Sequence, residues 1–184
     1  GTGEPDFATP DHVLDAAEAA MRAGDTHYTP TAGTPALRSA VCTKLERENG
    51  LAVRPEQVIV GTGAKQVLFD AFMATLDPGD EVLVPAPYWT SYRDMVRITG
   101  ASVTTVPTDA RTGFRMAPEA LERALTPRTR WLVLNSPCNP TGAAYRGEQL
   151  EALARVLDRH PHVWVASDEI YEHLVYDDFP FVSF

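Results

Sequence analysis

From Pro55 onward, short apolar runs alternate with stretches that have helical spacing. Five runs have the length and β-branched content of strands, namely "VIVG" (58–61), "EVLVP" (81–85), "ASVTTVP" (101–107), "WLVLN" (131–135) and "VWVAS" (163–167). The segments between them place apolar residues at helical spacing: 64–76, 88–99, 118–125 and 148–159. Strands that alternate with helices form a mostly parallel sheet with helices on both faces. The sequence therefore predicts an α/β fold of three layers.

Two helices are expected before this region. Each opens on a Thr-Pro pair (residues 9–10 and 34–35) and closes on a glycine, Gly24 and Gly50 respectively. Proline in the first turn and glycine just past the end are typical of helix boundaries. The stretch "THYTPTAG" between the two helices has the composition of a loop.

The chain thus divides into a helical N-terminal arm (residues 1–50) and an α/β domain (51–184). A content of 44% hydrophobic and 22% charged residues is ordinary for a globular protein, and no apolar run approaches the roughly 20 residues of a membrane span. The net charge of −9 argues against a nucleic-acid partner. The two cysteines do not make a disulfide framework, so a reducing, cytoplasmic setting fits best. They make no metal motif either, and no metal site is expected.

The first candidate site is the turn "GTGAK", where a predicted strand runs into a helix. Backbone N–H groups and the positive end of a helix dipole would converge at Gly63, Ala64 and Lys65. The stretch matches neither a P-loop nor the glycine pattern of dinucleotide binders. It is an anion site or a plain turn.

Two further strand ends carry polar side chains. In "LVLNSPCNPTG", two prolines restrict the loop that presents Asn139, so that its amide is either held for a ligand or part of a structural turn. Asp168 follows "VWVAS" and is either a helix cap or a member of a site.

Taken together, these strand ends offer an anion-binding turn, a fixed amide and a carboxylate at one edge of a sheet. Trp89 follows another strand, in "PAPYW", and provides a stacking surface for a flat ring. A phosphorylated aromatic cofactor that contains nitrogen needs these groups. The combination indicates pyridoxal phosphate.

The chain resembles the N-terminal arm and most of the cofactor domain of fold type I, class I/II aminotransferases, and within them the bacterial aspartate aminotransferase group. The stretches that carry the resemblance run in order along the chain: "GEPDF", "YTPTAGTPALR", "GTGAKQ", "DPGDEVLVPAPYW", "NSPCNPTG" and "SDEIYEHLVY". It implies transfer of an amino group between an amino acid and a 2-oxo acid.

The resemblance also implies a role for each cofactor residue. Asp168 would pair with the pyridine nitrogen, and Tyr171 and Asn139 would bond the ring hydroxyl oxygen. Trp89 would stack on the ring. The backbone of Gly63, Ala64 and Lys65 would bind the phosphate. A carboxylate against the ring nitrogen keeps the nitrogen protonated, which suits the ring to accept electrons.

Substrate and partner contacts are implied in the same way. Tyr28 would reach the cofactor phosphate of a second subunit, which implies a homodimer, and Gly3 would contact the substrate α-carboxylate. Trp89 and Asn139 would also border the substrate. Lys65 would recognise an acidic distal group, which points to aspartate or glutamate; a solvated lysine is the alternative.

The family's Schiff-base lysine, which binds the cofactor covalently, has no counterpart here. The chain has two lysines, Lys44 in the arm and Lys65 at the phosphate turn, and neither matches the position of that residue. We therefore expect the chain to be truncated on its C-terminal side. A lyase or synthase of the same fold, or a non-catalytic sensor domain that binds pyridoxal phosphate, are the alternative functions.

Overall fold

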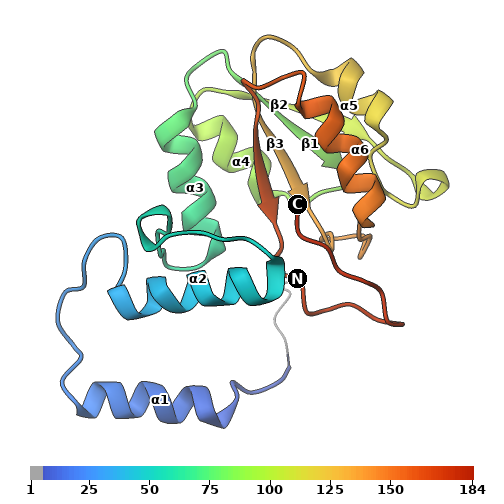
Figure 1. Cartoon of the computed structure of the whole chain (residues 1–184). Coiled ribbons are helices and arrows are strands. Elements are labelled where there is room, and N and C mark those ends of the chain that lie inside the picture. Colours follow the sequence, from blue (N-terminus) through green and yellow to red (C-terminus); the bar gives the residue numbers. More distant parts are fainter. Residues whose placement is uncertain (1–5) are drawn as a thin grey trace.

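A computed structural model describes residues 6–184 and contains one sheet of four strands. The strands are β1 (Glu81–Ala86), β2 (Ser102–Pro107), β3 (Thr129–Asn135) and β4 (Trp164–Asp168). Their order in the sheet is β2-β1-β3-β4, and every neighbouring pair is parallel. All four strands therefore end at the same edge of the sheet (Figure 1).

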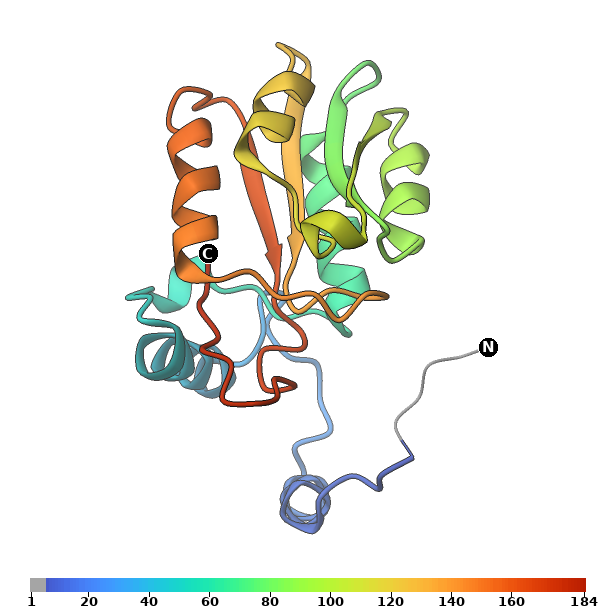
Figure 2. The ribbon, with the colours of Figure 1, turned by 90° about the vertical axis from the view of Figure 1, so that its right-hand side faces the viewer.

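Helices cover both faces of the sheet. Helices α3 (Ala64–Thr75) and α4 (Ser91–Ile98) lie on one face, and α5 (Pro118–Ala124) and α6 (Gly147–Leu157) lie on the other (Figures 1 and 2). Two short 3-10 helices, η1 (Pro55–Gln57) and η2 (Ala110–Thr112), lie in connections. The predicted three-layer α/β fold is confirmed.

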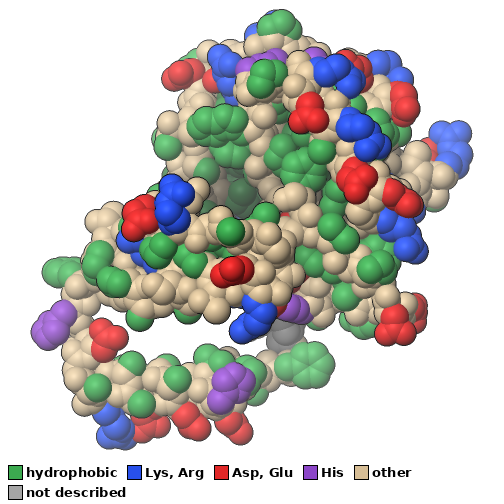
Figure 3. Space-filling model, viewed as in Figure 1, with side chains coloured by type: hydrophobic (Ala, Val, Ile, Leu, Met, Phe, Trp, Pro, Cys, Tyr) green, Lys and Arg blue, Asp and Glu red, His purple; other side chains and the backbone are tan. Residues whose placement is uncertain are grey.

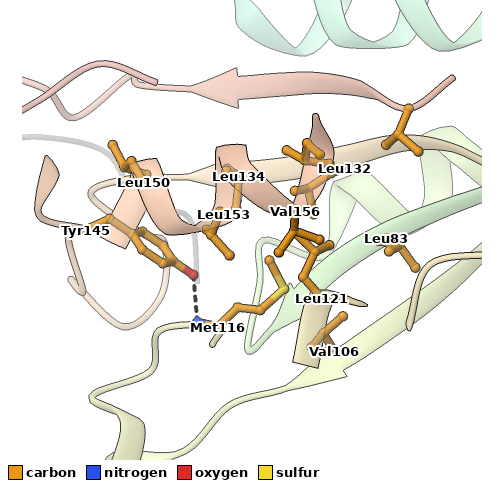
Figure 4. Packing of buried hydrophobic residues seen from close by; sticks show 12 residues of the cluster. Leu83, Val106, Met116, Leu121, Leu132, Leu134, Tyr145, Leu150, Leu153 and Val156 are labelled. Carbon is orange, nitrogen blue, oxygen red and sulfur yellow. Dashed lines mark hydrogen bonds between the residues drawn. The ribbon is translucent and has the colours of Figure 1, made fainter. Parts of the chain in front are cut away.

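The strands alternate their side chains between two apolar clusters. Leu83, Leu132 and Leu134 pack with α5 and α6 in the cluster of Figure 4, whereas Val82 and Val133 pack with α3 and α4. All five side chains are buried, and each contributes roughly 1.5–3 kcal/mol by leaving water. A slip of one residue would exchange the two faces, so this alternation fixes the register of the strands.

One expected strand is absent. Residues 58–61 ("VIVG") form no strand and pair with no strand among the described residues, and Val60 N–H donates instead to the Ala32 carbonyl at 3.0 Å. Val58 is buried while Ile59 is 73% exposed. The prediction of a strand here was wrong because an apolar run forms a strand only beside a pairing partner.

Two element boundaries also differ from the sequence prediction. Pro10 occupies the N-cap of α1 (Asp11–Arg22) rather than its first turn, and no side chain caps that helix. Helix α4 begins at Ser91, which leaves Trp89 in the loop after β1. The apolar residues of this loop continue the helical spacing of α4, so the spacing alone did not show where the helix begins.

The two N-terminal helices, α1 and α2 (Pro35–Asn49), bury no residue within the described part of the chain. Thr34 caps α2 through Leu37 N–H, and Gly50 ends it in the left-handed conformation, as the sequence predicted. Helix α1 lies apart from the α/β body (Figures 1 and 2), and Figure 3 shows apolar side chains at its surface. Leu14 and Met21 are among the exposed apolar residues of this helix. Within residues 6–184, no helix is long and apolar enough to cross a membrane.

Candidate cofactor site

A cavity of about 580 Å³ lies where the strands end. Its volume is within the range of about 300–1,000 Å³ that is usual for small-molecule sites. The lining residues come from four separate segments of the chain: Gly63, Ala64, Lys65, Trp89, Tyr92, Asn135, Asn139, Asp168, Ile170 and Tyr171.

One end of the cavity is formed by the first turn of α3. The N–H groups of Ala64 and Lys65 find no acceptor among residues 6–184, because the first helical residues have no partner within a helix. Gly63 precedes them with φ 85° and ψ 160°, a conformation that only glycine adopts readily, and a Cβ on it would meet open space. This turn therefore presents backbone donors and the positive end of a helix at the cavity, which is what an anion site requires.

Hydrogen bonds within the turn itself hold it in this shape. Thr62 N–H donates to Gln66 Oε1 at 2.5 Å, and Gly63 N–H donates to the Gly61 carbonyl at 2.9 Å. A Cβ on Gly61 would lie 2.8 Å from Val67 Cγ2, so the helix packs too closely there for any larger residue without a shift. The donors of the turn are thus preorganised.

Asn135, the last residue of β3, joins two parts of the site. It lies opposite Asp168 in the register of β3 and β4. Its Nδ2 donates to the Asp168 carbonyl at 2.9 Å, and its Oδ1 accepts from Asn139 N–H at 2.7 Å. One amide side chain therefore sets the backbone positions of Asn139 and Asp168 together.

Asp168 ends β4 with its carboxylate at the cavity. Tyr92 OH donates to Asp168 Oδ2 at 2.5 Å, and Ile170 N–H donates to Asp168 Oδ1 at 3.3 Å. Burial and the hydrogen bond to Asp168 raise the pKa of Tyr92 well above its usual value, so Tyr92 stays a neutral donor. Tyr171 lines the same cavity three residues further along.

The aromatic wall of the cavity is Trp89. Its ring meets the Tyr92 ring edge-on, with 5.3 Å between the centroids, so the indole is fixed by a buried neighbour. Lys65 Nζ lies 5.0 Å from the centroid of the Trp89 ring, within reach of a cation–π interaction. The Lys65 side chain therefore lies at the cavity and is in contact with Trp89.

The cavity brings together seven residues that the sequence singled out: Gly63, Ala64, Lys65, Trp89, Asn139, Asp168 and Tyr171. Tyr28 does not line it and is fully exposed. Gly3 lies outside the described residues.

Three cavity residues, Tyr92, Asn135 and Ile170, escaped the sequence prediction. Asn135 could have been suspected from its place at a strand end. Tyr92 and Ile170 carried no such signal, because Tyr92 reaches Asp168 across 76 residues of sequence and Ile170 acts through its backbone.

Lys44 is engaged elsewhere. Its ammonium pairs with Glu172 and donates to Asn49 Oδ1 at 2.7 Å. Asn49 Nδ2 in turn donates to Glu172 Oε2 at 3.0 Å, which ties the end of α2 to the segment after β4. The ligand atoms of Glu48, Glu172 and His173 lie within 4.8 Å of one another, but this group already contains the Lys44 cation.

A family model for aminotransferase class I and II matches residues 1–184, and the chain belongs to this family. The aspartate/prephenate aminotransferase of Cereibacter sphaeroides is 57% identical over 183 residues, which are 100% of this chain and 46% of that protein. The chain spans slightly less than half the length of the curated relatives it matches.

Solved structures agree with this assignment. The crystal structure of aspartate aminotransferase from Rhizobium meliloti matches with a TM-score of 0.98 at 55% identity and covers 100% of this chain and 46% of that chain. A structure of aspartate aminotransferase from Thermus thermophilus with maleate matches with a TM-score of 0.94 at 55% identity. The match covers 98% of this chain and 47% of that chain. The fold is therefore that of an aminotransferase.

The Asn135 link predicts a local change on mutation. Asn135→Ala removes the acceptor for Asn139 N–H, and a hydrogen bond of about 1 kcal/mol corresponds to roughly fivefold faster amide exchange there. Asn135→Asp keeps an acceptor oxygen for Asn139 N–H, although it loses the donor to Asp168 and adds a negative charge. Hydrogen exchange should therefore speed up at Asn139 in the alanine variant and stay close to the parent rate in the aspartate variant. Equal exchange in both variants would contradict the link.

Proposed function

We propose that the whole protein binds pyridoxal phosphate and transfers an amino group between aspartate or glutamate and a 2-oxo acid. One observation carries this proposal: an anion-binding turn, an aromatic wall, an amide, a phenol and a carboxylate converge on one cavity of about 580 Å³. Membership of aminotransferase class I and II supports the reaction class. The names of the relatives support aspartate as amino donor and prephenate as one 2-oxo acid.

The residues present fit the cofactor. The N–H groups of Ala64 and Lys65, which have no acceptor in the described part of the chain, suit a phosphate, and the half-buried Trp89 suits one face of a pyridine ring. The backbone N–H of Asn139 is bonded to Asn135, but no hydrogen bond from the described residues occupies the Asn139 side-chain amide or the Tyr171 hydroxyl, so both are available to an anionic ring oxygen. Pyridoxal phosphate supplies an electron sink when an amino acid loses its α proton.

Asp168 is the residue on which the chemistry depends in this proposal. Its carboxylate would face the ring nitrogen and keep that nitrogen protonated, since an adjacent negative charge favours the charged form of a base. Tyr171 and Asn139 would stabilise the opposite, oxygen-bearing side of the ring. The covalent lysine would come from outside this chain, because Lys44 is engaged by Glu172 and Lys65 belongs to the phosphate turn.

Lys65 is proposed to select acidic substrates. Its ammonium lies at the cavity beside Trp89, where it can pair with a distal carboxylate. The Thermus thermophilus relative, whose structure contains the dicarboxylate maleate, supports this choice. The backbone of Gly3, in the "GEPDF" stretch, is proposed to contact the substrate α-carboxylate.

The proposed functional unit is a homodimer in the cytoplasm. Tyr28 is fully exposed and so is available to reach the cofactor phosphate of a second copy, and the apolar side chains of α1 are likewise left exposed by residues 6–184. Both cysteines are free, in keeping with a reducing compartment.

The test of the function is Asp168→Asn in the whole protein. The amide cannot keep the ring nitrogen charged, so exchange of the aspartate α proton with deuterium, followed by NMR, should slow by about 100-fold or more. Cofactor content, measured by visible absorbance, should fall far less because the phosphate and stacking contacts remain. The exposed Asp158→Asn serves as the matched control, since its side chain lies at the end of α6. Parent-like exchange in Asp168→Asn would reduce Asp168 to a structural residue.

Specificity is tested by Lys65→Ala. Loss of the ammonium should lower kcat/KM for aspartate and glutamate by the equivalent of about 1–3 kcal/mol, the usual contribution of a hydrogen bond to a charged group. Alanine and phenylalanine should lose little, apart from any shared effect of the missing contact with Trp89. Steady-state kinetics on all four amino acids decides the matter. A uniform loss would leave the reaction class intact and remove the preference for acidic substrates.

A further inference from the structure

Tyr92 is a buried phenol directly behind the carboxylate of the site. It lies in the first turn of α4, its side chain is 1% exposed, and its hydroxyl donates to Asp168 Oδ2 at 2.5 Å. Its ring also contacts Trp89 edge-on at 5.3 Å between centroids. One side chain therefore contacts both the carboxylate and the aromatic wall of the cavity.

The two oxygens of Asp168 are held unequally. Oδ2 accepts the short bond from Tyr92, whereas the one bond that Oδ1 accepts from residues 6–184 is the longer bond of 3.3 Å from Ile170 N–H. The terminal torsion of an aspartate is broad, so a carboxylate without a firm partner can rotate. Because each carboxylate oxygen can accept two hydrogen bonds, Asp168 is oriented by Tyr92 and still has acceptor positions for a ligand.

Tyr92 provides this orientation without adding a charge of its own. Burial and the bond to Asp168 raise the pKa of its hydroxyl, so the group remains a neutral donor. Its ring packs in the apolar cluster between the sheet and helices α3 and α4. This cluster also contains Phe72 and Val96. The donor is thus fixed by the core rather than by the ligand.

We propose that Tyr92 is a positioning residue for the amino-transfer reaction: its hydroxyl orients the Asp168 carboxylate toward the ring nitrogen of the cofactor. This inference rests on the proposed function, since it concerns how Asp168 meets the ring. Tyr92 acts through Asp168 and needs no contact with substrate.

The test is a double-mutant cycle in the whole protein loaded with pyridoxal phosphate. Tyr92→Phe removes only the hydroxyl and should slow exchange of the aspartate α proton by about 10- to 100-fold, by analogy with the loss of a hydrogen-bond partner behind a metal ligand. In the Asp168→Asn background the same change should slow exchange by less than about twofold, because the carboxylate it orients is gone. An equal factor in both backgrounds would show that Tyr92 acts independently of Asp168 and would overturn the proposal.

A second readout does not depend on activity. With cofactor labelled by 15N in the ring, the ring nitrogen signal of Tyr92→Phe should move from the protonated toward the unprotonated position at neutral pH. Tyr145→Phe is the matched control, because Tyr145 is also a buried phenol but accepts from Met116 N–H at 2.8 Å, away from Asp168. That control should lower thermal stability while keeping the parent signal and the parent exchange rate.

The outcomes separate the two proposals. A whole protein that neither binds the cofactor nor exchanges the α proton overturns the proposed function and the role of Tyr92 with it. A functional parent whose Tyr92→Phe variant has the parent 15N signal and exchange rate overturns only the positioning role.

Discussion

The parallel pairing of β1, β3 and β4 is the constraint on which the rest of the site depends. Parallel strands end at one edge, so the loops that follow them converge. The buried alternation of Leu132, Val133 and Leu134 fixes the register of β3, and that register sets Asn135 opposite Asp168. Burial of apolar side chains inside the sheet thus decides where the polar groups stand at its edge.

The groups at this edge differ in chemistry along the cavity. The first turn of α3 offers N–H donors, Asn139 and Tyr171 offer neutral side chains, and Asp168 offers a carboxylate. Such a series complements a ligand that has a phosphate at one end, an anionic oxygen on a ring and a protonated nitrogen further along. Asp168 is supported by two further side chains: Asn135 donates to its backbone carbonyl and Tyr92 donates to its carboxylate.

Local sequence signals predicted the features that local sequence determines. Thr34 and Gly50 bound α2, the Gly-Thr-Gly turn opens α3, and Asp168 stands at the end of a strand. What escaped prediction depends on distant partners. The run 58–61 is not a strand because no neighbour pairs with it, and the roles of Tyr92 and Asn135 arise from contacts across 76 and 33 residues. Apolar periodicity cannot show which side chains meet after folding.

The central claim is that the strand-end groups and the first turn of α3 form one site for one cofactor. A crystal structure of the whole protein grown with pyridoxal phosphate tests it most directly. The account predicts the phosphate on the N–H groups of Ala64 and Lys65, and the ring nitrogen within about 3 Å of the Asp168 carboxylate. A cofactor bound at another place, or with its ring nitrogen turned away from Asp168, would contradict the account.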